Sequence, residues 1–180
     1  MHKVFVSYHH EQPDQVYRDQ FEQIFAKRSK VFITKSVQIG DINPQLNTET
    51  IRQKIRDEYL ADSTVTVVLV GRYTWQRKHV DWEIASSIRD TKNNSRSGLL
   101  GILLPSYQQT TQNVLCYNRH TVPPRLYFNV VCGYANIYPW STNPTDLTNW
   151  IALAFERRNR ITPDNSYPSY INNRPGDQWY

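Results

Sequence analysis

Residues 64–70 constrain the fold more than any other part of this sequence. They read Thr-Val-Thr-Val-Val-Leu-Val and are followed by Gly71. This β-branched, almost continuously apolar run is typical of a strand that is buried on both faces of a sheet. A sheet of that kind is parallel and has a layer of helices on each face, so short apolar runs should alternate with amphipathic helices.

The rest of the chain shows this alternation. Further strand-like runs lie at residues 4–6, 31–33 and 99–104, and amphipathic stretches lie at about residues 13–25, 48–59, 80–89 and 144–155. Asn47 or Thr48 can cap the second of these helices, and Asn143 followed by Pro144 marks the start of the last. A fifth strand lies either in residues 126–131 or in residues 134–138. The sequence therefore predicts an α/β domain with a parallel sheet of about five strands and helices on both faces.

The chain divides into one domain, residues 1–160, and an irregular C-terminal tail, residues 161–180. One domain is the expectation for 180 residues with an ordinary hydrophobic content of 39%. The tail is rich in Asn, Pro and Tyr without periodicity, so it is either disordered or a strap packed by its aromatic side chains. The polar stretch 106–124 is long for a loop and is typical of a lid or an insertion.

Composition excludes several classes of protein. The net charge of +5 is spread along the chain without a long basic block, which suits a polyanionic small molecule as well as a nucleic acid. Cys116 and Cys132 form no CxxC pair and the histidines form no HExxH motif, so two free thiols and no metal site are expected. The sequence has no secretory leader pattern and no run of about 18 apolar residues, which predicts a cytoplasmic protein that does not span a membrane.

Polar and aromatic residues follow the predicted strands at their carboxyl ends, where parallel sheets bind ligands. Hydroxyls, rings and positive charges gather there, as a nucleotide requires: Ser7, Tyr8, His9 and His10 after the first strand, Lys35, Ser36, Gly40 and Asp41 after the second, and Gly71, Arg72, Tyr73, Thr74 and Trp75 after the third. Neither GxGxxG nor GxxxxGK[ST] is present, which disfavours a dinucleotide-binding Rossmann loop and a P-loop.

Glu83 is the main candidate for chemistry. On a helix starting near Val80, residues Val80, Ile84 and Ile88 form the buried stripe, and Glu83 projects about 60° to one side of it. This places a carboxylate at the edge of the core, in the first turn of the helix and facing the carboxyl ends of the strands. The structural alternative is a solvated glutamate that favours the positive end of a helix.

Several segments resemble TIR domains. Val4-Phe5-Val6-Ser7-Tyr8 is similar to their first strand and Ser-Tyr step, and Val31-Phe32-Ile33 with Ile39-Gly40-Asp41 is similar to their second strand and the loop after it. The segment from residue 64 to Asp81-Trp82-Glu83-Ile84, with Tyr73-Thr74-Trp75, Arg77 and Val80, resembles their strand, loop and glutamate-bearing helix. The similarity covers residues 3–105, with a weaker match at Tyr138-Pro139-Trp140. It is greatest to the TIR-like subclass that includes the NAD-consuming signal producer of Thoeris antiphage systems.

The resemblance implies a flavodoxin-like fold and cleavage of NAD at the nicotinamide ribosyl bond. NAD is then the substrate, no separate cofactor is needed, and Glu83 is the catalytic carboxylate. The residues expected to bind NAD are Ser7, Tyr8, His9, Ser36, Asp41, Trp75, Arg77 and Trp82. Arg77 would meet the pyrophosphate, and Asp41 lies in a loop that orders when subunits associate.

The implied product is an ADP-ribose-derived signal, expected to be cyclic, which a downstream effector senses in antiphage defence. The sequence leaves open whether water or an internal nucleophile attacks the ribose. Self-association on activation is expected, whereas no nucleic acid and no membrane is expected as a partner.

The sequence departs from many TIR domains, which carry Trp-Cys where this chain has His79 and Val80. Two alternatives remain: a non-catalytic TIR-like adaptor that works by assembly, and an enzyme that transfers ribosyl groups of nucleosides or nucleotides.

Overall fold

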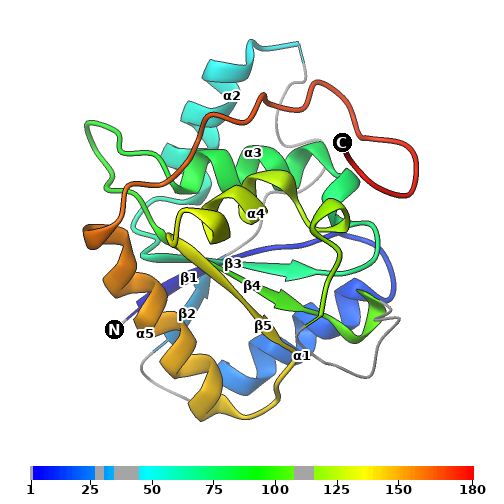
Figure 1. The fold of residues 1–180 in the computed structure, drawn as a ribbon. Helices are drawn as coiled ribbons and strands as arrows, with labels where there is room; N and C mark the ends of the chain where they lie inside the picture. Colours follow the sequence, from blue (N-terminus) through cyan, green and yellow to red (C-terminus); the bar gives the residue numbers. More distant parts are fainter. Residues whose placement is uncertain (1, 27–30, 35–44, 108–115) are drawn as a thin grey trace.

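A parallel sheet forms the centre of the molecule (Figure 1). The computed structural model describes residues 2–26, 31–34, 45–107 and 116–180, without the side chains of residues 26, 31–34 and 48. The sheet order is β2-β1-β3-β4-β5, and all neighbouring strands are parallel. The strands are β1 (His2–Ser7), β2 (Val31–Thr34), β3 (Val65–Val70), β4 (Gly98–Leu103) and β5 (Ala135–Pro139). This is the order of flavodoxin-like folds, and it confirms the predicted α/β class.

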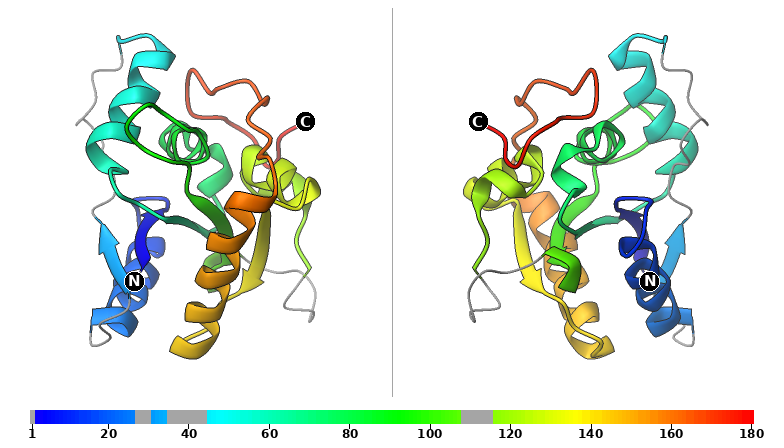
Figure 2. Two further views of the ribbon diagram at one scale, coloured as in Figure 1. Left: turned by 90° about the vertical axis from the view of Figure 1, so that its left-hand side faces the viewer. Right: turned by 90° about the vertical axis from the view of Figure 1, so that its right-hand side faces the viewer.

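Helices cover both faces of the sheet, as Figures 1 and 2 show. Two of them pack on one face, α1 (Asp14–Ala26) and α5 (Pro144–Arg160). The opposite face carries α3 (Lys78–Ser87) and α4 (Pro124–Val131). Beside α3 lies α2 (Thr48–Lys54), which continues into the π-helical turn η1 (Ile55–Tyr59). The described residues also form three 3-10 turns: η2 (Thr74–Gln76), η3 (Pro105–Tyr107) and η4 (Arg119–Thr121).

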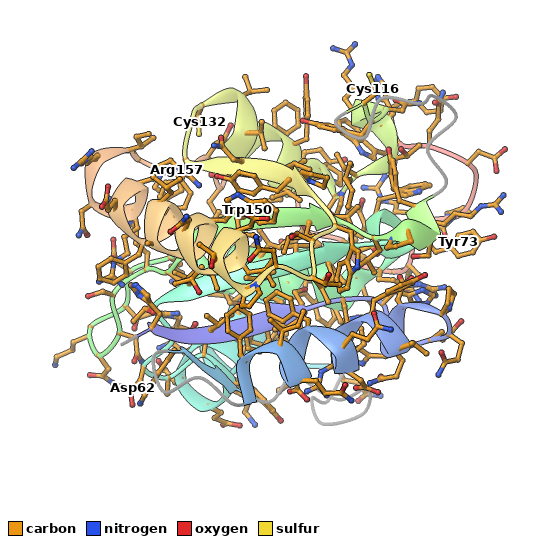
Figure 3. All side chains as sticks on the ribbon, turned by 90° about the horizontal axis from the view of Figure 1, so that it is seen from below. Asp62, Tyr73, Cys116, Cys132, Trp150 and Arg157 are labelled. Carbon is orange, nitrogen blue, oxygen red and sulfur yellow. The ribbon has the colours of Figure 1, made fainter. Side chains whose placement is uncertain are left out.

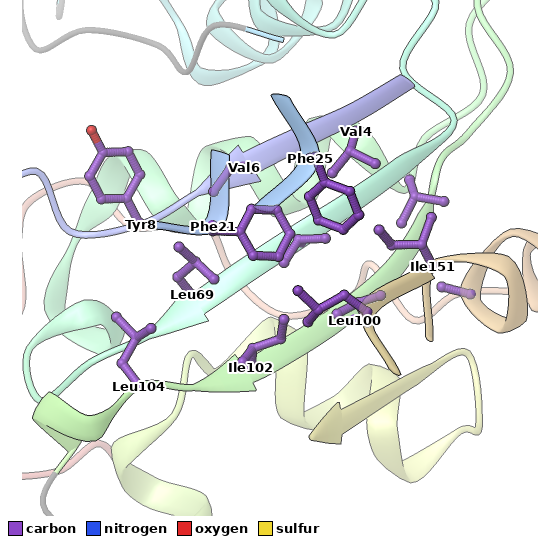
Figure 4. Close-up of a cluster of buried hydrophobic side chains, with 14 residues drawn as sticks. Val4, Val6, Tyr8, Phe21, Phe25, Leu69, Leu100, Ile102, Leu104 and Ile151 are labelled. Atoms are coloured by element: carbon purple, nitrogen blue, oxygen red, sulfur yellow. The ribbon is translucent and has the colours of Figure 1, made fainter. Parts of the chain in front are cut away.

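The two sides of β1 belong to different parts of the core. Val4 and Val6 pack with Phe21 and Phe25 of α1 in the cluster drawn in Figure 4. Phe5 belongs instead to a cluster with α2 and η1 on the other face. Because side chains alternate along a strand, Ser7 at the end of β1 faces the same side as Phe5, towards α3.

The structure decides between the two segments considered for the fifth strand. Residues 135–139 pair with β4, whereas residues 126–131 all belong to α4. Pro124 begins this helix, a position where its fixed φ angle and missing N–H group are tolerated. The predicted caps are confirmed, because Asn47 accepts a hydrogen bond from the Thr50 amide and Asn143 accepts one from the Thr145 amide.

Residues 161–180 form an ordered strap without helix or strand. The strap crosses α3 and α4, and its colours run from orange to red in Figures 1 and 2. Tyr170 and Trp179 are 1% and 6% exposed, so aromatic side chains anchor it. Of the two readings of this tail, the structure therefore shows the packed one. Within its described residues, the polar stretch 106–124 contains most of η3 and all of η4.

The two cysteines lie apart on the surface, as Figure 3 shows. Cys116 and Cys132 are both exposed and carry free thiols. The predicted absence of a disulfide between them is thus confirmed.

Candidate functional site

Glu83 projects from α3 towards the end of β1. Ser7 Oγ donates a hydrogen bond of 2.5 Å to Glu83 Oε2, and both residues are 0% exposed. Val80 and Ile84 of the same helix, and Ile88 directly after it, pack in the hydrophobic cluster on this face of the sheet, as the helical spacing predicts. The helix begins at Lys78, so Glu83 lies in its second turn and not in the first turn as predicted. The structure therefore rules out the solvated alternative for Glu83 and places its carboxylate at the carboxyl edge of the sheet.

Complete burial of this carboxylate limits what can reach it. A sugar hydroxyl can bind Glu83 only if the segments around the site move, because the side chain exposes no surface. The predicted loop residues Ser36 and Asp41 lie outside the described residues. The described residues near Glu83 form a closed arrangement, which suits a buried structural contact as well as a site that opens for its substrate.

Tyr8 lies on the opposite face of the sheet from Glu83. Its ring packs in the cluster with α1 (Figure 4), and its hydroxyl donates a hydrogen bond of 2.7 Å to Gln15 Oε1. Its backbone faces the other way, since its carbonyl accepts a hydrogen bond of 3.0 Å from His79 Nε2. Alternation along β1 explains this, because Ser7 and Tyr8 are consecutive.

His9 and Arg77 come together next to the end of β1. His9 is 5% exposed, and its pKa is lowered by burial and then by the positive charge of Arg77. Its Nε2 atom lies 3.5 Å from Glu11 Oε2, which opposes that lowering. Arg77 is thus near enough to His9 for its charge to lower the pKa of that imidazole, and both side chains carry nitrogen donors that can bind a pyrophosphate.

A histidine cluster surrounds this pair, and the sequence did not reveal it. The rings of His10 and His79 lie 4.7 Å apart, and His10 also lies 4.4 Å from the ring of Tyr8. Burial lowers the pKa of His10 and lowers that of His79 to about 4. Three neutral imidazoles therefore stand beside the site near pH 7. His9 and His10 are adjacent, but His79 is too far from them in sequence for spacing to have indicated the cluster.

The two predicted tryptophans pack against other parts of the structure. Trp82 packs with Phe5 and Ile55, and its Nε1 donates a hydrogen bond of 2.8 Å to the Tyr170 carbonyl. Trp75 is buried and helps to line a cavity of about 500 Å³, whose other lining residues belong to the strap, residues 174–180. Glu83 does not line this cavity, so the hollow and the candidate carboxylate are separate features of the described structure.

Asp81 and Arg125 form a buried ion pair that sequence analysis did not find. Arg125 Nε donates to Asp81 Oδ1 at 2.9 Å, and the two side chains are 0% and 3% exposed. Arg125 also donates to the carbonyls of Asn165 and Tyr167 in the strap. The pair thus joins α3, α4 and the strap. The sequence contained only part of the information needed to find this ion pair. Asp81 lies two positions before Glu83, but no pattern in the sequence linked Asp81 to Arg125.

Asp14 is a second buried carboxyl group at this edge of the sheet. It is 3% exposed, accepts a hydrogen bond of 2.6 Å from Ser106 Oγ, and has a pKa raised by burial. It packs directly against Gly71, where a Cβ atom would overlap its carboxylate. An aspartate in the first turn of a helix is common for electrostatic reasons, so the sequence did not distinguish it.

In residues 2–26, 31–34, 45–107 and 116–180, no group of three or more His, Cys, Asp or Glu side chains is arranged to hold a metal ion. None of the helices in the same part of the chain has both the length and the apolar character needed to cross a bilayer.

The fold and the buried glutamate define a class of protein. A parallel sheet in the order β2-β1-β3-β4-β5, with a carboxylate on α3 directed at the end of β1, is the arrangement that the resemblance to TIR-like domains implied. Residues 5–109 match the family described as Thoeris protein ThsB, TIR-like domain. The match covers more than half of the 180 residues, and the chain belongs to this family. Comparison with curated proteins gives no match.

Proposed function

We propose that this protein cleaves NAD between nicotinamide and ribose, with Glu83 as the catalytic carboxylate. The observation that carries the proposal is the place of Glu83: an inward-facing carboxylate beside Ser7, at the sheet edge where α/β proteins bind ligands. Membership of the Thoeris TIR-like family supports the choice of NAD.

The chemistry needs a fixed negative charge more than it needs a metal. When the bond between ribose C1′ and nicotinamide N1 breaks, both electrons leave with nicotinamide, which becomes neutral, and positive charge develops on the ribose. A carboxylate that accepts hydrogen bonds from the ribose hydroxyls holds the sugar and stabilises that charge. Ser7 would orient the Glu83 carboxylate through the hydrogen bond already present.

The fate of the ribose cation determines the product. Attack by water gives ADP-ribose and a proton, whereas attack by a nucleophile within the same molecule gives a cyclic product. We propose the cyclic form as a signal that a downstream effector senses in antiphage defence, with self-association of this protein as the activating step. His9 and Arg77 are the described residues that would meet the pyrophosphate, since the charge of Arg77 acts on His9 at the carboxyl edge of the sheet.

The direct test is release of nicotinamide from NAD by the purified protein, with mass analysis of the second product. We expect Glu83→Gln to lower the rate by about 10²- to 10³-fold, the usual cost of removing one preorganised charge. Glu58→Gln is the matched control, because Glu58 is an exposed glutamate outside the site and its loss should leave the rate unchanged. Equal rates for Glu83→Gln and the wild type would remove the assignment.

Burial of Glu83 favours a second candidate function. A carboxylate that exposes no surface and is bonded to Ser7 can serve purely to join α3 to β1, as in a TIR-like module that acts by assembly. This alternative predicts concentration-dependent oligomers without nicotinamide release. The two functions separate when turnover is measured across protein concentrations at which oligomers form.

A further inference from the structure

Helix α3, which carries Glu83, does not receive its N-terminal cap from the residue before it. Arg77 occupies the cap position with extended backbone angles, φ −89° and ψ 119°, and makes no capping hydrogen bond through its side chain. The first amides of a helix need acceptors from outside the helix. Here Asn173 Oδ1 accepts a hydrogen bond of 3.0 Å from the Lys78 amide, the first residue of α3. The cap therefore comes from the strap, 95 positions further along the chain.

The strap follows the whole segment around the start of α3 in the opposite direction. Its Arg174 amide donates to the Gln76 carbonyl at 2.8 Å. Further back, the Tyr170 amide donates to Asp81 Oδ2 at 3.0 Å, and Asn165 Nδ2 donates to the Ala85 carbonyl at 3.0 Å. The residue numbers in the strap decrease as those in the helix increase, so the two segments run antiparallel, one along the other (Figures 1 and 2).

Tyr170 fixes the rotation of the helix about its axis. Its carbonyl accepts from Trp82 Nε1 at 2.8 Å, and its hydroxyl donates to the Trp75 carbonyl at 2.9 Å. Asp81 and Trp82, which are neighbours in α3, are therefore both hydrogen-bonded to Tyr170 of the strap. Because successive helical residues are about 100° apart, holding these two residues directs Glu83 towards the sheet and Ser7.

We propose that the strap is a positioning element for the Glu83 carboxylate and that Asn173 is its positioning residue. Asn173 acts through α3 and contacts neither Glu83 nor the expected substrate position. Loss of its cap frees the first turn of α3, which widens the range of positions open to Glu83, five residues after Lys78 in the same helix. The catalytic consequence rests on the proposed NAD cleavage, whereas the structural consequence does not.

The test compares three variants of the full chain. Asn173→Ala removes the capping oxygen, and Asn173→Asp keeps an oxygen acceptor with a charge that suits a helix N-terminus. Asn172→Ala is the matched control, since Asn172 is also exposed and makes none of the hydrogen bonds that join the strap to α3. We expect kcat for nicotinamide release to fall roughly fivefold in Asn173→Ala, the factor that corresponds to one lost helix cap. KM should stay near the wild-type value, and Asn173→Asp and Asn172→Ala should retain wild-type kcat.

Amide hydrogen exchange gives a second measurement that does not need catalysis. Exchange in the first turn of α3 should be faster in Asn173→Ala than in Asn172→Ala, while thermal melting shows that both remain folded. If the wild type releases nicotinamide and these two alanine variants have equal kcat, the positioning role is wrong. If the wild type releases none, the proposed function fails, and unchanged exchange in α3 would then overturn the role of the strap as well.

Discussion

Ser7 Oγ and Glu83 Oε2 lie 2.5 Å apart and join the end of β1 to α3 across 76 positions of sequence. Both side chains are fully buried. A hydrogen bond to a charged acceptor is stronger than one between neutral groups, particularly where water is excluded. This contact therefore fixes where the first strand ends relative to the helix, and it fixes the orientation of the carboxylate in the same step.

Replacing Ser7 by alanine should destabilise the protein and slow NAD cleavage. Loss of a buried hydrogen bond to a charged group costs about 1.5–3 kcal/mol of unfolding free energy. Denaturant unfolding measures this cost, and the rate of nicotinamide release measures the loss of orientation at Glu83. Ser86→Ala is a suitable control, because Ser86 is equally buried but donates only to the Trp82 carbonyl within its own helix. Equal unfolding free energies for the two variants would show that the bond from Ser7 to Glu83 stabilises the protein no more than the bond from Ser86 within α3.

Removal of Arg125 should be far more costly than removal of a surface arginine. Arg125→Met leaves Asp81 as a buried carboxylate without its cation, which costs about 3–5 kcal/mol. Arg160→Met removes an arginine whose pairing with Glu156 is exposed to solvent, and its expected cost is at most about 0.5 kcal/mol. Chemical denaturation of the two variants provides the comparison, and similar midpoints would contradict it.

The sequence predicted the layers of this fold well because they depend on local patterns. A β-branched apolar run gave β3, and helical spacing gave the buried stripe of α3 that places Glu83. Caps at Asn47 and Asn143 depend on residues next to the helices they cap, so they too could be predicted. The fifth strand could not be assigned, since two neighbouring apolar segments had similar composition and only one pairs with β4.

The surroundings of Glu83 depend on contacts between distant positions. Hydrogen bonds from the strap to α3 span about 80 to 100 positions, and no local pattern encodes them. Tyr8 was expected beside Glu83 because it follows Ser7, but strand alternation directs its ring to α1. The sequence thus identified which carboxylate faces inward and missed the side chains that hold its helix in place.

A methyl group at Gly98 should be less well tolerated than one at Gly101 on the same strand. A Cβ atom at Gly98 would overlap the carbonyl of Ala154 in the backbone of α5, which cannot turn aside. At Gly101 the nearest atom is Leu126 Cδ2 at 2.8 Å, the end of a flexible side chain. We expect Gly98→Ala to cost about 1–3 kcal/mol, as overpacking usually does, and Gly101→Ala to cost less. Thermal unfolding of both variants checks the order, and a less stable Gly101→Ala would reverse it.

His79 should make stability fall in acid. Burial lowers its pKa from 6.5 to about 4, although the hydrogen bond to the Tyr8 carbonyl partly opposes this effect. Its folded pKa is therefore below its unfolded value, and between pH 6.5 and about pH 4 the unfolded chain binds more protons. The stability that His79 contributes is complete above pH 6.5 and is lost as the pH falls towards 4, by about 3 kcal/mol in total.

Glutamine at position 79 isolates this effect. His79→Gln keeps a side-chain N–H donor for the Tyr8 carbonyl but cannot be protonated in this pH range. We expect the unfolding free energies of the wild type and the variant to converge or cross as the pH is lowered from 7 to 4. Only in the wild type does folding in acid require an imidazole to lose its proton. His9 and His10, whose pKa values are lowered as well, remain in both proteins, but the positive charge that each gains in acid lowers the pKa of His79 further in the wild type alone. Parallel curves over this range would show that the imidazole of His79 is not held neutral by its surroundings.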